Sequence, residues 1–216
     1  MCTESIRFQK SRLTEMPTFK SYLASLSSPI DSFLEDHIFE SEAHRILYED
    51  KEVGCVAVHK GTLLTVFHVV GGARRLGQRI LLQAVAHFNV RSAFVPTCDE
   101  FFLSHAADAH TSLDKQAYFF IEGDAGAEPA ETLESVRYRP ATQADVAEIV
   151  AASGDFLDKP AEMAADGQIH VGHLDEGLVA LGIVVPSRLF DRQASIGVFT
   201  RESHRRRGIG VNTIVH

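Results

Sequence analysis

The order of strand-like and helix-like segments occurs twice along this chain, and this repetition limits its possible folds more than any other feature. The two runs are separated by residues 123–131, an acidic segment rich in small residues that also contains Pro129. Segments of this composition commonly connect domains. A repeat of roughly 130 residues is too long for a solenoid period and indicates duplicated domains instead. We therefore predict a first domain at residues 1–123, a linker at 124–135 and a second domain at 136–216.

In the first half, runs of β-branched or alternating residues predict strands, and apolar residues at helical spacing predict helices. The predicted strands are residues 5–10, 44–49, 53–59, 63–69, 93–95 and 116–121, and the predicted helices are residues 15–26, 30–39 and 74–88. Thr97 and Glu100 fit a capping box, in which both side chains bind free amides at a helix start. A further helix is therefore expected from that point.

In the second half, the same order returns and then stops. The predicted strands are residues 136–139, 169–173, 178–185 and 195–200, and the predicted helices are residues 143–152 and 160–165. Thr142 is expected to cap the first of these helices. A last helix follows the strand at 195–200, and the chain ends at His216 about one turn into it.

Composition narrows the functional classes. The formal net charge of the 216 residues is −8, which argues against non-specific binding to nucleic acid or to an anionic membrane surface. No run approaches the roughly 18 apolar residues of a membrane span, and no signal peptide is visible at the start. Three widely spaced cysteines without a Cys-x-x-Cys pair argue against disulfides and structural zinc. We expect a cytoplasmic protein with no metal, nucleic-acid or membrane partner.

One segment near the C-terminus carries the clearest chemical signal. The predicted strand at 195–200 is followed by four arginines between positions 201 and 207, and then by Gly208 and Gly210. A helix that begins here has amides without intrahelical partners and a positive dipole end. The two glycines allow an anion to approach the backbone closely. The pattern predicts an anion site, with a solvated basic turn as the alternative. It matches neither a Walker A loop nor the Gly-x-Gly-x-x-Gly fingerprint.

Arg205-x-x-Gly208-x-Gly210, placed directly after a hydrophobic strand, resembles the Arg/Gln-x-x-Gly-x-Gly/Ala motif of the GNAT acetyltransferases. The resemblance covers nearly the whole chain as two copies, similar to bacterial tandem GNAT proteins. It implies an α/β (α+β) fold with two domains, each a mixed, mostly antiparallel sheet flanked by helices. In that family, amides of this loop hold the diphosphate of coenzyme A, and the preceding strand pairs with the pantetheine arm.

Carried over by position, the resemblance implies that Val198 and Thr200 line the pantetheine, while Phe199 points to the opposite face. The amides of residues 206–211 would hold the diphosphate. The full set of implied acetyl-CoA-binding residues is Val198, Phe199, Thr200, Arg205, Arg206, Arg207, Gly208, Ile209, Gly210 and Val211.

The first copy departs from this motif. Its equivalent loop, residues 72–79, keeps Gly77 but has Arg79 in place of the second glycine. Because that larger side chain would crowd an approaching diphosphate, we interpret the first copy as a structural or substrate-side domain with weak or lost cofactor binding.

Catalytic residues stay unassigned. The resemblance implies the amide of Val198 as the donor to the oxyanion. The family's base is often a Glu or an ordered water near this strand, which has no carboxylate, and Asp191 just before it is better explained as a turn residue. The family's usual acid is a Tyr that would lie beyond His216. We expect the chain to continue past that residue, because the second copy would otherwise expose an apolar sheet face and a strand edge.

The predicted activity is transfer of an acetyl group from acetyl-CoA to a primary amine of a small molecule, with peptide or protein amines less favoured. One alternative is a non-catalytic module that binds acyl-CoA or a partner protein for regulation. Another is loss of cofactor binding in the duplicated domains. The sequence identifies neither the acceptor nor the oligomeric state, and it allows a homodimer.

Overall fold

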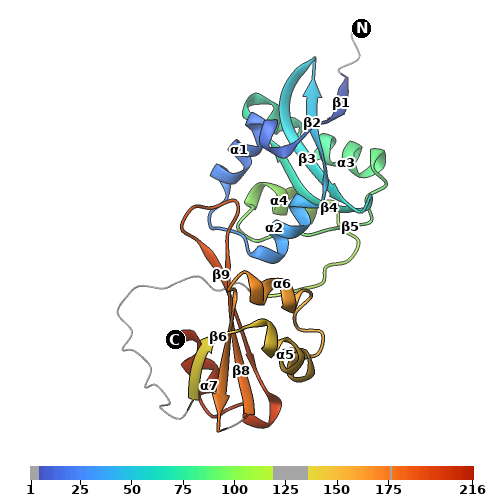
Figure 1. Ribbon diagram of the computed structural model, residues 1–216. Helices are drawn as coiled ribbons and strands as arrows, with labels where there is room; N and C mark the ends of the chain where they lie inside the picture. The colour runs from blue at the N-terminus through green and yellow to red at the C-terminus, as the bar shows by residue number, and fades with distance from the viewer. Residues whose placement is uncertain (1–4, 119–135, 176) are drawn as a thin grey trace. The chain divides into compact units, whose positions relative to one another are not determined.

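The computed structural model describes residues 5–118, 136–175 and 177–216, which form two sheets flanked by helices (Figure 1). The chain divides into two compact units. The first comprises the described residues up to 118 and the short segment 188–191, and the second comprises the other described residues from 136 onward. The predicted linker, residues 124–135, lies outside the described residues. No helix of the described part is both long enough and apolar enough to cross a membrane.

The first unit is built on a five-stranded sheet with the order β1-β2-β3-β4-β5. Its strands are β1 (Ile6–Lys10), β2 (Glu42–Tyr48), β3 (Lys51–His59), β4 (Leu63–Val69) and β5 (Ser92–Ala93). Its helices are α1 (Pro17–Ser25), α2 (Ser32–Phe39), α3 (Gly77–His87) and α4 (Glu100–Ala107), with 3-10 turns η1 (Leu13–Glu15) and η2 (Gly71–Leu76). Neighbouring strands are antiparallel except for β4 and β5, which are parallel.

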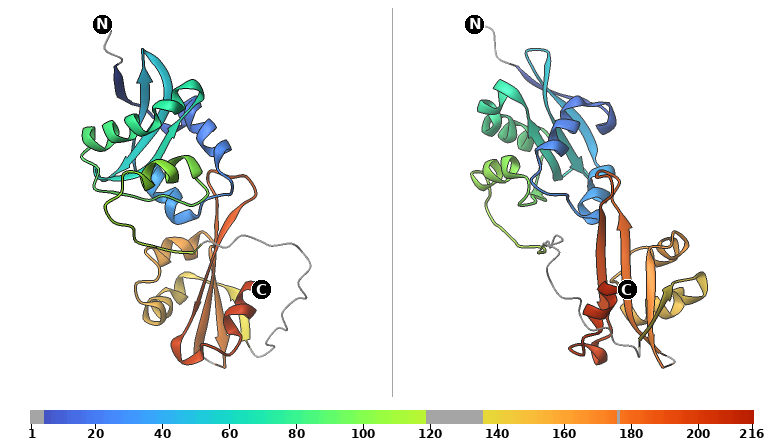
Figure 2. Two further views of the ribbon diagram at one scale, coloured as in Figure 1. Left: turned by 180° about the vertical axis from the view of Figure 1, so that it is seen from behind. Right: turned by 90° about the vertical axis from the view of Figure 1, so that its left-hand side faces the viewer.

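Helices cover both faces of this first sheet. Figure 2 shows α1 on one face and α3 and α4 on the other. Successive residues of a strand point to opposite faces, so Val66 packs with Phe19 and Leu34 whereas its neighbour Phe67 packs with Ile80. The near-continuous apolar runs of β3 and β4 follow from this arrangement, because both faces of these strands are buried.

The second unit is built on a four-stranded antiparallel sheet with the order β6-β7-β8-β9. Its strands are β6 (Val136–Pro140), β7 (Ile169–Leu174), β8 (Gly177–Pro186) and β9 (Ala194–Thr200). Its helices are α5 (Val146–Ser153), α6 (Pro160–Ala165) and α7 (Ile209–Val215), with 3-10 turns η3 (Gln143–Asp145) and η4 (Glu202–His204). Figure 2 shows α5 and α7 on opposite faces of this sheet. Ile149 of α5 packs with Leu181, and Ile209 of α7 packs with Ala180.

The predicted mixed α/β class is confirmed, and most predicted elements are present with shifted ends. The capping box at Thr97 is wrong: Asp99 caps α4, and its carboxylate accepts a 2.9 Å hydrogen bond from the amide of Phe102. The chain first turns, with the Asp99 amide bonded to the Pro96 carbonyl, so the helix starts two residues later than predicted. The strand predicted at 116–121 is absent over 116–118, and its remainder lies outside the described residues.

Candidate functional site

The predicted site lies along β9, which pairs with β8 and with no other described strand. Just past β9, the amide of Arg201 donates to the carbonyl of Val179 at 2.9 Å, so the main chain of Arg201 faces β8. Main-chain groups of successive residues point to opposite sides of a strand. The amides and carbonyls of Val198 and Thr200 therefore point away from β8, toward the open edge of the sheet.

The side chains of β9 alternate between the two faces of the sheet. Val198 and Thr200 lie toward α7, because a Cβ added at Gly210 would be 3.9 Å from Val198 Cγ1 and 3.5 Å from Thr200 Oγ1. Phe199 lies on the opposite face, and its ring centroid is 5.5 Å from that of Phe156. Both Gly210 distances are ordinary van der Waals contacts, so a methyl group fits there and its absence leaves the backbone of α7 uncovered.

A tight loop joins β9 to α7. Arg206 and Gly208 both have left-handed backbone, with φ of 63° and 80°. Gly208 is the N-cap of α7, and its carbonyl accepts a 3.0 Å bond from the amide of Asn212. The amides of residues 209–211 belong to the first helical turn and have no partner inside α7. Left-handed backbone is accessible to glycine without a steric penalty, which explains why Gly208 stands at the turn into the helix.

The same loop carries concentrated positive charge. Arg205 is bound to the end of β9, because its Nε donates a 3.1 Å hydrogen bond to the carbonyl of Thr200. Arg206 and Arg207 are exposed. In the described part of the chain, neither they nor Arg201 form an ion pair within 4 Å. The loop is therefore a local cationic patch in a chain whose formal net charge is −8.

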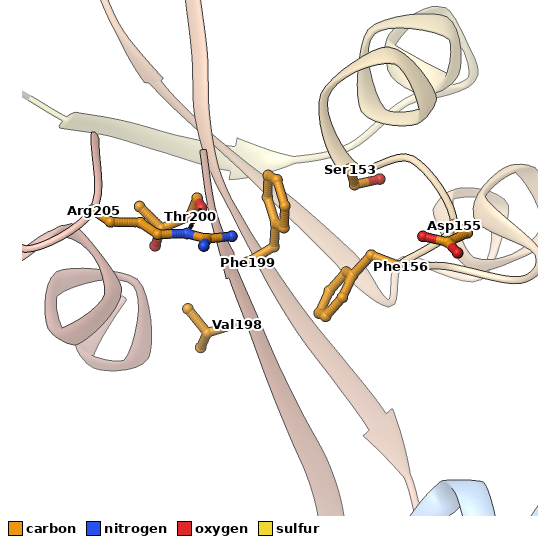
Figure 3. Close-up of a pocket in the computed structure, with 7 residues that line it drawn as sticks. All are labelled: Ser153, Asp155, Phe156, Val198, Phe199, Thr200 and Arg205. Carbon is orange, nitrogen blue, oxygen red and sulfur yellow. Dashed lines mark hydrogen bonds between the residues drawn. The ribbon is translucent and has the colours of Figure 1, made fainter. Parts of the chain in front are cut away.

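An open pocket of about 560 Å³ lies against this edge of the second sheet (Figure 3). The residues that line it are Ser153, Asp155, Phe156, Val198, Phe199, Thr200 and Arg205. Of the ten predicted binding residues, only those of β9 and Arg205 line the pocket. The other six, residues 206–211, do not; the Ile209 side chain is 3% exposed and belongs to the core, so only its main chain could contact a ligand.

Sequence reasoning missed the second wall of the pocket, which consists of Ser153 at the end of α5 and of Asp155 and Phe156 in the connection to α6. The sequence contains only one weak indication of this wall, a glycine at the end of α5. Gly154 ends α5 with φ 61° and ψ −124°, a backbone conformation that glycine adopts far more readily than other residues. Nothing in the local pattern says that the chain then turns toward β9.

The corresponding loop of the first unit is covered. A Cβ added at Gly77 would lie 2.2 Å from Nε2 of His105 in α4, so that imidazole rests directly on the start of α3. The Arg74 guanidinium stacks over the ring of Phe101 at 4.5 Å. Arg79, which was expected to crowd an anion, is exposed on α3. Side chains of α4 thus occupy the space beside this loop.

No three His, Cys, Asp or Glu side chains in the described residues are grouped as a metal site would need. A protein-family profile described as "Acetyltransferase (GNAT) domain" matches residues 13–123, just over half of the 216 residues. A comparison with curated proteins gives no match.

Solved structures similar to this chain include two proteins of the same kind. The first is an acetyltransferase from the GNAT family from Colwellia psychrerythraea, with a TM-score of 0.75 and 15% identity; the match covers 97% of this chain and 82% of that one. The second is a GCN5-related N-acetyltransferase from Kribbella flavida, with a TM-score of 0.30 and 17% identity, and the match covers 37% of this chain and 25% of that one. The first likeness is one of fold, and because it covers nearly the whole chain it includes both sheets.

Proposed function

Because the chain belongs to the GNAT acetyltransferase family, we propose that it transfers an acetyl group from acetyl-CoA to a primary amine of a small-molecule acceptor, at the open edge of β9. One observation carries this proposal. The main-chain groups of Val198 and Thr200 point away from β8 beside a pocket and a glycine-bearing cationic loop. An extended ligand with amide groups can pair with such an edge as an added strand would.

The residues have separate roles in this proposal. The amides of residues 206–211, with the exposed Arg206 and Arg207, bind the diphosphate, because unpaired amides and guanidinium groups both favour phosphate oxygens. The edge of β9 holds the pantetheine arm. The neutral amine nitrogen attacks the thioester carbonyl and a C–N bond forms. The C–S bond then breaks, and the proton lost by the nitrogen is taken up by the leaving thiolate, so that coenzyme A departs as the thiol. The amide of Val198 donates to the oxyanion formed on the way.

We further infer a tandem arrangement, with GNAT-like domains at residues 1–123 and 136–216 joined by the linker at 124–135. Two findings support it. The strand and helix order of the first unit recurs in the second up to the helix after the fourth strand. The family profile matches the first half, whereas the motif ending in Gly208 and Gly210 lies in the second.

A matched pair of variants at Gly210 tests acetyl-CoA binding. Gly210→Leu should weaken acetyl-CoA binding about tenfold or more, equivalent to about 1.4 kcal/mol, because the longer side chain blocks the space beside Val198 and Thr200. Gly210→Ala should stay within about twofold, since a methyl group fits there without displacement. Leucine and alanine both have higher helix propensity than glycine, so both variants should fold. Isothermal calorimetry measures the dissociation constants.

Catalysis is tested separately by the release of coenzyme A thiol when amines are supplied. A wild-type chain that binds acetyl-CoA and releases thiol with at least one amine supports the transferase. Binding without release from any amine would favour the non-catalytic, regulatory alternative. No binding by the wild-type chain, or equal binding by Gly210→Leu, would contradict the proposed site.

A further inference from the structure

The wall of the pocket that faces β9 carries a single acid. Among the seven lining residues Asp155 is the only carboxylate, and it lies in the connection between α5 and α6. Asp155 is exposed. It forms no ion pair with a described residue. Arg205, the only cation that lines the pocket, comes from the opposite wall and is bound through Nε to Thr200. The pocket therefore has a negative wall and a positive wall.

Apolar surface lies next to this acid. The Phe156 side chain is 46% exposed although it belongs to the pocket, and its ring is tilted against that of Phe199 with centroids 5.5 Å apart. Figure 3 shows the two phenyl rings between β9 and the carboxylate of Asp155. An exposed ring beside a carboxylate is suited to a ligand with an apolar body and a cationic end, which gains from ring contact and from charge pairing.

We propose that the acceptor is a small primary amine with an aromatic or alkyl body and no carboxylate, and that Asp155 and Phe156 select it. This inference rests on the proposed function and names the substrate class for the same pocket. An alkylammonium ion is the dominant form of a primary amine at neutral pH, so a carboxylate in the pocket concentrates it beside β9.

The same charges exclude other amines. An amino acid or the C-terminal end of a peptide has a carboxylate that Asp155 repels. Arg205 would attract such a group, but it lies on the wall assigned to the anionic donor. Asp155 stabilises the ammonium ion, whereas the chemical step needs the neutral amine. The carboxylate therefore favours binding of the acceptor without assisting the reaction itself, which makes Asp155 a specificity-determining residue. Its removal should raise KM and leave kcat nearly unchanged.

The test uses the full chain saturated with coenzyme A and titrates small ligands by calorimetry. Phenethylamine and hexylamine should bind about fivefold more tightly than the neutral 2-phenylethanol and hexanol, and also more tightly than phenylalanine; this is the size expected for one partly exposed ion pair. Asp155→Asn should remove the preference for amine over alcohol, and Asp155→Glu should keep it. Phe156→Ala should weaken the binding of amines and of alcohols to the same extent.

Asp158→Asn is the matched control, because Asp158 is an exposed acid of the same connection that does not line the pocket. If coenzyme A binds but amines and alcohols bind equally, or if Asp155→Asn behaves as Asp158→Asn does, the substrate class is wrong while the proposed function stands. Failure of the wild-type chain to bind coenzyme A would overturn the proposed function and this inference together.

Discussion

His68 and Asp99 are two buried ionisable residues of the first unit, 2% and 1% exposed, and each has one side-chain atom without a hydrogen-bond partner in the described part. Burial, together with the smaller effect of the nearby Arg74 charge, lowers the pKa of His68 to about 4. Burial raises the pKa of Asp99 to about 6, against the opposing effect of its bond from the Phe102 amide. Each residue therefore titrates differently in the folded and unfolded chains.

These two residues should act in opposite directions on acid stability. Between about pH 6.5 and pH 4 the unfolded chain binds a proton at His68 and the folded chain does not, so stability falls as the pH falls. Between about pH 6 and pH 4 the folded chain binds a proton at Asp99 first, so stability rises as the pH falls. In the wild-type chain these two contributions to the slope partly cancel.

Single variants separate the two effects. At pH 5 the contribution of His68 is a loss of about 2 kcal/mol and that of Asp99 a gain of about 1 kcal/mol, relative to pH 7. His68→Gln should therefore reduce the loss of unfolding free energy on acidification, and Asp99→Asn, which keeps a capping side chain, should increase it. Urea unfolding at both pH values, followed by circular dichroism, measures this. Parallel pH profiles for all three proteins would contradict the assignment.

At the scale of elements, the side chain of Asp145, at the start of α5, is hydrogen-bonded to strand β6. Its two carboxylate oxygens each accept a 2.7 Å hydrogen bond from Arg139 of β6, and Oδ2 also accepts one of 2.7 Å from the amide of Thr142. The bonds from Arg139 lower the pKa of Asp145 well below its usual range. Its stabilisation is therefore present above about pH 4 and is lost as the pH falls toward the lower folded pKa.

Removing that carboxylate should destabilise the second unit by about 1 kcal/mol, because the capping-box bond to the Thr142 amide and the ion pair with Arg139 are both lost. Asp145→Ala tests this by urea unfolding at pH 7, and Asp145→Asn should lose less because it still accepts one bond. The difference between wild type and Asp145→Ala should shrink below pH 4. A difference that stays constant down to pH 2 would show that the ion pair with Arg139 is not its source.

The elements also show what the sequence can and cannot predict. Gly208, Gly210 and the preceding strand were recognisable because a strand that turns into a helix needs particular residues at the turn. The wall containing Asp155 was not, since its position depends on packing between segments about 45 residues apart. The prediction at Thr97 failed for a related reason. The capping pattern was local, whereas the turn after Pro96 also has a distant partner, because the amide of Ser27 donates to the carbonyl of Cys98 at 3.0 Å.

At the scale of the whole molecule, the two sheets differ in how accessible the edge of the fourth strand is. β5 pairs with β4 only at Leu63 and Leu64, so the rest of β4 has no strand partner on that side within the described residues. Phe101 of α4 packs beside this stretch of β4, with its ring centroid 5.8 Å from that of Phe67 and 6.0 Å from that of His68, and His105 covers Gly77. In the second unit the edge of β9 faces an open pocket instead. The first copy should therefore lack an accessible place for the donor.

One chain should accordingly bind one acetyl-CoA. Calorimetric titration of the full chain should give a stoichiometry of one, and Gly210→Leu should weaken that single transition about tenfold or more without revealing a second. His105→Ala, which uncovers Gly77, should leave both the stoichiometry and the affinity unchanged, because Arg79 still occupies the position of the second glycine and Phe101 still lies against β4. A stoichiometry of two, or full-affinity binding that persists in Gly210→Leu and disappears on substitution in the first loop, would place the donor in the first unit and reverse the roles assigned to the two copies.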